Sequence, residues 1–149
     1  MPHTLIDEHA VTIEATPADV WPALLATVRS AFSGPLATTY ARAIRSVPWR
    51  PSGPLTVGAT IAGFRVTEST EPAVLTLEGQ HLFSRYALSF ALSPQPTGGS
   101  RLAAESRAEF PGPHGAAYRL LVIRSGFHAR SVRHLLTLIR RAVPPAPHG

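Results

Sequence analysis

The sequence predicts a single α+β domain in which an antiparallel β-sheet packs against one long C-terminal helix. Two observations support this class. After Gly58, successive segments alternate apolar and polar residues, as half-buried strands do. The segment from Gly115 to Val143 then has a helical period, with an apolar stripe opposite a stripe of arginines. We expect one domain over residues 1–143 and a disordered Pro-rich tail at 144–149.

The first segment of the chain, Thr4 to Glu14, predicts a strand because Val11 and Ile13 alternate with polar residues. Thr16 is a suitable N-cap for a short helix that begins at Pro17. The apolar residues of this helix recur at helical spacing, and we expect the tryptophan to be buried: Val20, Trp21, Leu24, Leu25 and Val28. Ser33-Gly34-Pro35 ends the helix.

A second helical piece is expected from Leu36 to Ile44. Three prolines then force an irregular loop that carries Trp49 and Arg50, which serve either as a lid or as the anchor of the loop itself.

The strands predicted after Gly58 run over 60–69, 73–79, 82–92 and 101–110, with turns at Glu71-Pro72 and at 94–99. Their alternation predicts an antiparallel sheet with one face toward solvent. We assign Arg65, Arg85 and Glu105 to that face; the alternative is that a bulge or a register slip turns them toward the helix.

The composition is that of a folded protein, with 44% hydrophobic and 15% charged residues among 149. No apolar run reaches the length of a membrane span, and the N-terminus lacks a signal pattern, so we expect a cytoplasmic protein without a transmembrane segment. The chain has no cysteine, which excludes disulfides, thiolate metal sites and cysteine nucleophiles.

The formal charge of +5 raises the question of nucleic-acid binding. The six arginines after Pro113 follow the predicted solvent face of the helix without aromatic residues to stack on bases, so we expect no nucleic-acid partner. A salt-sensitive contact with an acidic surface is an alternative role for Arg119, Arg130, Arg133 and Arg141.

Three segments resemble bacterial members of the SRPBCC superfamily, the START, Bet v 1 and polyketide-cyclase group. They are residues 11–21 (VTIEATPADVW), 57–64 (VGATIAGF) and 108–112 (AEFPG). The element order resembles that superfamily as well. The resemblance implies a helix-grip fold, in which a curved antiparallel sheet wraps a long C-terminal helix and two short helices follow the first strand. It also implies a pocket between the sheet and the long helix.

Alternation assigns the walls of that pocket. The expected ligand-binding residues are Phe64, Val66, Leu77, Ser84, Tyr86, Leu88, Ser106, Tyr118, Leu121, Ser125, His128 and Val132. Leu75, Phe90, Leu102 and Leu135 complete the inward set, and small side chains such as Ala62, Ala104 and Ala108 would enlarge the space. The serines either bond a ligand or relieve crowding.

Tyr86 and His128 are the catalytic candidates, because each can donate and accept a proton on an otherwise apolar stripe. Their alternative role is that of satisfied core residues. The seven histidines lack the spacing of a zinc site, and Thr97 to Ser100 form only a turn, so we expect neither a metal nor a cofactor.

Besides that contact with an acidic surface, two functions that use the pocket remain. The first is binding or carriage of a small hydrophobic molecule between the sheet and the C-terminal helix. The second is a cofactor-independent cyclase or dehydratase acting on a hydrophobic carbonyl substrate in the same pocket, with proton transfer by Tyr86 and His128.

Overall fold

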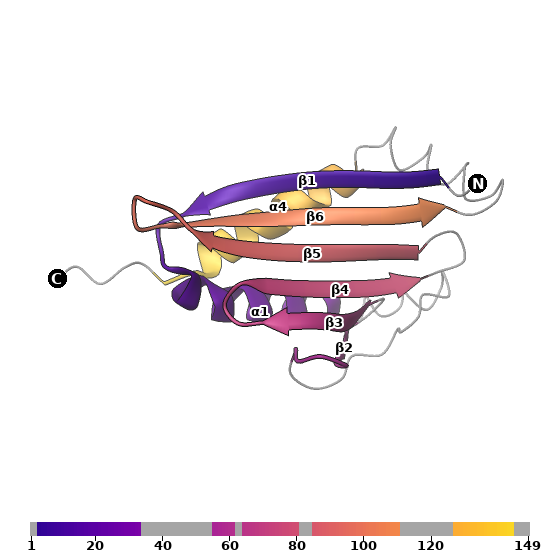
Figure 1. Cartoon of the computed structure of the whole chain (residues 1–149), viewed down its shortest axis with the longest axis horizontal. Helices are drawn as coiled ribbons and strands as arrows, with labels where there is room; N and C mark the ends of the chain where they lie inside the picture. Colours follow the sequence, from indigo (N-terminus) through magenta and orange to yellow (C-terminus); the bar gives the residue numbers. More distant parts are fainter. Residues whose placement is uncertain (1–2, 34–54, 62–63, 81–84, 111–126, 145–149) are drawn as a thin grey trace.

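The computed structural model describes residues 3–33, 55–61, 64–80, 85–110 and 127–144. Within them, a six-stranded antiparallel sheet carries both helices on one face (Figure 1). The strands are β1 (His3–Ile13), β2 (Thr60–Ile61), β3 (Phe64–Thr70), β4 (Val74–Gln80), β5 (Arg85–Pro94) and β6 (Ser100–Phe110). The helices are α1 (Pro17–Ser33) and α4 (Phe127–Ala142). The α+β class predicted from the sequence is therefore confirmed.

The strand order across the sheet is β1-β6-β5-β4-β3-β2. Strands β2 to β6 form a meander, and β1 pairs with the last strand rather than with β2. The first strand and the last helix thereby lie together, since α4 contacts both β1 and β6 (Figure 1).

The first helix forms as the sequence predicts. Thr16 Oγ1 accepts a hydrogen bond of 3.3 Å from the backbone N–H of Asp19, which is the N-cap geometry expected of a threonine before a helix. Val20, Trp21, Leu24 and Val28 are buried, because their spacing places them on one side of the helix.

The prediction of one continuous strand over 60–69 is wrong. Thr60 pairs with Arg65 and Ile61 with Phe64, so β2 and β3 are the arms of a hairpin joined through two residues. The alternation that joined Ala62, Phe64 and Val66 missed this break, because apolar residues alternate with small or polar ones without interruption from 62 to 67 and nothing in that pattern marks a turn. Ala62 lies outside the described residues.

A register shift between Val66 and Glu68 marks a β-bulge in the pairing of β3 with β4. A bulge bends its strand and increases the local twist. Beyond it, Ser69 pairs with Leu75 and its Oγ donates a 3.3 Å hydrogen bond to the carbonyl oxygen of Leu55, so β3 is also held from the segment before β2.

The core lies between the sheet and the helices. In α4, the predicted apolar stripe is confirmed over its described part: Val132, Leu135, Leu136 and Ile139 are buried. Opposite them, Arg130 and Arg141 are exposed. The earlier part of the long helix predicted from Gly115, the second helical piece at 36–44 and the loop with Trp49 and Arg50 lie outside the described residues, as does most of the C-terminal tail.

Candidate functional site

One row of side chains runs across five strands on the face that carries the helices. In the register of the sheet, Asp7 of β1 pairs with Ser106 of β6, which pairs with Leu88 of β5. Leu88 in turn pairs with Leu77 of β4, and Leu77 with Val66 of β3. Directly paired residues share a face, so this row forms an apolar wall with a polar end at β1.

The next row places two aromatic rings together. Phe64 and Tyr86 lie with their ring centroids 4.9 Å apart and their planes at 72°, an edge-to-face pair. Tyr86 pairs with Gly79 of β4, the strand that separates the two rings. The rings can meet over β4 because glycine has no side chain to stand between them.

Ser106 is the polar residue within the apolar part of the wall. It is 5% exposed, and its Oγ has no hydrogen-bond partner among the described residues. Its pairing partners on the two sides are Asp7 and Leu88. A buried hydroxyl without a partner costs about 1–3 kcal/mol, so a group that bonded it would recover that free energy.

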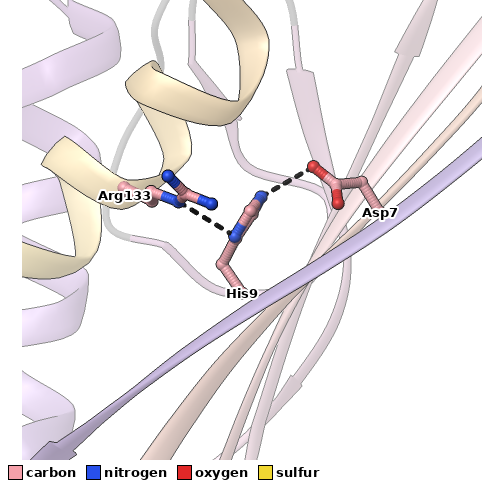
Figure 2. Close-up of polar contacts among 3 residues, drawn as sticks. All are labelled: Asp7, His9 and Arg133. Carbon is pink, nitrogen blue, oxygen red and sulfur yellow. Dashed lines mark hydrogen bonds and ion pairs between the residues drawn. The ribbon is translucent and has the colours of Figure 1, made fainter. Parts of the chain in front are cut away.

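A chain of three polar side chains joins β1 to α4 (Figure 2). His9 Nε2 lies 2.7 Å from Asp7 Oδ2, and Arg133 Nε donates to His9 Nδ1 over 3.4 Å. A guanidinium can only donate and a carboxylate can only accept. His9 therefore accepts at Nδ1 and donates from Nε2, which defines its tautomer.

This polar chain was not predicted from the sequence. Extending the alternation of Val11 and Ile13 toward the N-terminus places His9 and Asp7 on the same face, so a signal for the two was present. The assignment of Arg133 to solvent is confirmed, because its side chain is exposed. The contact with His9 was not predicted: Arg133 follows the buried Val132, and its length lets Nε reach β1 from there.

The opposite face of the sheet carries charged residues, as predicted. Arg65 and Arg85 are exposed, and Glu105 Oε1 accepts a 2.6 Å hydrogen bond from Arg107 Nε. The arginine assignments to solvent are therefore confirmed, and neither arginine is available to a ligand on the helix side of the sheet.

The remaining predicted site residues divide into two groups. Val132 is buried on α4, toward the sheet and α1. Ser84, Tyr118, Leu121 and Ser125 lie outside the described residues, and His128 is described only as part of the backbone of α4. The structure thus brings together Phe64, Val66, Leu77, Tyr86, Leu88 and Ser106 on one face; their role in binding stays a prediction.

Two further features concern the described part of the chain only. No three histidine, aspartate or glutamate side chains in it gather as they would around a metal ion. None of its helices has the length and apolar content needed to traverse a bilayer.

Comparison with solved structures identifies the fold. Protein Ms6760 from Mycobacterium smegmatis aligns with a TM-score of 0.60 at 10% identity, covering 97% of this chain and 93% of that one. CalU16 from Micromonospora echinospora aligns with a TM-score of 0.57 at 17% identity, over 97% of this chain and 78% of that one. Ara h 8.0201 aligns with a TM-score of 0.55 at 12% identity, over 95% of this chain and 98% of that one.

No protein-family model and no curated protein sequence matches the chain. At these identities the structural alignments establish the fold alone. The antiparallel sheet, its strand order and the helix across β1 and β6 have the arrangement of a Bet v 1-like, helix-grip fold.

Proposed function

We propose that the protein binds or carries a small hydrophobic molecule between the helix-bearing face of the sheet and the C-terminal helix. The observation that carries the proposal is Ser106, whose buried hydroxyl lacks a partner among the described residues. Leu88 and Leu77 continue its row as an apolar surface. An apolar wall with a few convergent polar groups is typical of small-molecule sites.

The fold supports the same proposal. A sheet that bends away from a straight helix leaves space that side chains must fill or a ligand can occupy. The bulge at Val66–Glu68 bends β3, and Ala104 and Ala108 contribute short side chains on the helix-bearing face. Affinity would come mainly from apolar burial, at about 25 cal/mol per Å².

Native mass spectrometry of freshly purified protein tests the proposal directly. We expect a co-purified apolar compound. After delipidation, we expect saturable binding of an apolar fluorescent probe. Leu88→Trp should weaken the binding of this probe, because the larger side chain fills the space over the wall. The matched control is Ala91→Trp on the exposed side of the same strand, which should leave probe binding unchanged. Equal binding by both variants would contradict the proposed location.

A cyclase or dehydratase acting on a hydrophobic carbonyl substrate is the second candidate. Tyr86 favours it, because its ring lies on the helix-bearing face against Phe64 and a phenol can transfer a proton. The exposure of Arg65 and Arg85 favours carriage, because no arginine of β3 or β5 then faces the substrate within the described residues.

Turnover measurements on two variants separate the candidates. If the protein is an enzyme of this type, Tyr86→Phe and His128→Ala each reduce turnover by about 10²-fold or more while binding of the substrate changes little. If the protein is a carrier, no turnover is detected for the parent protein or for either variant, and the variants change only the affinity for the bound molecule.

A further inference from the structure

Arg133 differs from two other arginines of the described chain in what its guanidinium contacts. Arg101 Nη2 pairs with Glu8 at 3.1 Å and Arg107 with Glu105 at 2.6 Å, both on the far face of the sheet. Arg133 instead donates through Nε to the neutral nitrogen of His9, and among the described residues it forms no ion pair. Its positive charge is therefore held in place without being neutralised.

The histidine that holds Arg133 is itself held. The side chain of His9 is 15% exposed, and Asp7 Oδ2 fixes the ring from its other nitrogen (Figure 2). Asp7 and His9 are two residues apart on β1, a strand paired with β6 along its whole length. The imidazole separates the Asp7 carboxylate from the guanidinium, so the Asp7 charge is not in direct contact with the Arg133 charge.

Within the described part of the chain, one end of the guanidinium of Arg133 has no partner. Because Nε is occupied by His9, the two Nη groups remain for a second partner, and they form the end-on fork that matches a carboxylate. The helix adds no competing anion, since α4 contains neither Asp nor Glu. Pre-orienting a long side chain lowers the entropy lost on binding.

The polar chain that holds Arg133 is connected to the wall described above. Asp7 pairs directly with Ser106, so the polar chain continues the row of Ser106 and Leu88 to the edge of the sheet where β1 meets α4. An elongated ligand with its apolar body over Leu88 and Leu77 would have its end near Ser106 and this edge.

We propose that the ligand of this site is an amphiphilic carboxylic acid, whose carboxylate is bound end-on by Arg133. His9 and Asp7 are positioning residues that hold the guanidinium toward it. This inference rests on the proposed binding function and specifies the chemical class of the ligand.

The test compares decanoate with decan-1-ol, which share an apolar chain and differ in the head group. Their dissociation constants are measured by displacement of an apolar fluorescent probe from the full chain. We expect decanoate to bind about fivefold more tightly, the scale of a partly exposed ion pair, and the preference to shrink as salt is added.

Variants then assign the preference to Arg133. Arg133→Gln should abolish it while the affinity for decan-1-ol stays the same. The matched control is Arg141→Gln, an exposed arginine of the same helix whose loss changes the net charge equally and should leave the preference intact. His9→Leu should reduce the preference, and His9→Gln should restore part of it, because the amide oxygen can accept from Nε.

The outcomes separate this inference from the proposed function. If decanoate and decan-1-ol bind with equal affinity, or if Arg133→Gln and Arg141→Gln reduce the preference for decanoate alike, the carboxylate assignment is wrong and the binding function stands. If neither decanoate nor decan-1-ol binds and no apolar compound co-purifies, the proposed function fails and this inference fails with it.

Discussion

Ser100 donates a hydrogen bond of 2.6 Å from its Oγ to the backbone carbonyl oxygen of Ala15, across 85 positions of the sequence. Ser100 is fully buried and opens β6, and Ala15 lies just after β1 and before α1. The bond therefore holds the connection between β1 and α1 against the start of β6. Each of these three elements contributes residues to the core.

The first prediction concerns this bond. Ser100→Ala should lower the free energy of unfolding by about 1–2 kcal/mol, because it leaves the Ala15 carbonyl without its partner. Urea denaturation measures the change. Ser93→Ala, at an exposed position of β5, serves as the control and should stay within about 0.5 kcal/mol of the parent protein. Coincident curves for the two variants would show that the bond adds nothing to stability.

The second prediction concerns the neighbouring glycine. A Cβ at Gly99 would lie 2.7 Å from the backbone oxygen of Ile13, closer than van der Waals contact allows. Gly99→Ala should therefore destabilise the protein by about 1–3 kcal/mol, because the end of β1 must move away. Thermal unfolding followed by circular dichroism measures the loss.

Gly98 is the comparison for Gly99, because the reason that it favours glycine is different. It has φ +93° and open space where a Cβ would be placed, so its constraint is conformational and not steric. Asparagine tolerates positive φ better than other non-glycine residues, and Gly98→Asn should thus cost less than Gly99→Asn. The reverse order would contradict the steric explanation for Gly99.

The third prediction concerns the buried hydroxyl of the proposed site. Ser106→Ala should raise the stability of the ligand-free protein by about 1 kcal/mol, because it removes a polar group that has no partner among the described residues. Ser89→Ala is the comparison: Ser89 Oγ lies 3.0 Å from Thr76 Oγ1, so its removal breaks a bond and should not stabilise. A loss of stability in ligand-free Ser106→Ala would mean that the hydroxyl has a partner in the folded chain.

The fourth prediction tests the start of α1. Thr16→Ala should lower the free energy of unfolding by about 0.5–2 kcal/mol, since the backbone N–H of Asp19 loses its side-chain acceptor. Thr16→Ser keeps the hydroxyl and should retain most of the stability of the parent protein. Chemical denaturation measures the free energy of unfolding of both variants. If side-chain size and not the hydrogen bond mattered, Thr16→Ser would be no more stable than midway between Thr16→Ala and the parent protein.

The faces of the strands followed from the sequence. The alternation around Leu75, Leu88 and Leu102 predicted which residues are buried, and the exposed Arg65 and Arg85 agree with it. The N-cap at Thr16 and the apolar stripe of α4 were also readable from spacing. All of these depend on interactions between residues close in sequence, or on burial of an apolar residue whatever its partner is.

Only the tertiary structure decided which segments meet. The alternation within β1 does not reveal that this strand lies beside β6, because an alternating strand has the same pattern whichever neighbour it has. That pairing sets Asp7 opposite Ser106, and the packing of α4 brings Arg133 to His9 across 124 positions. Local periodicity reports the face of a side chain, whereas a polar contact between distant elements depends on how the whole sheet and helix are assembled.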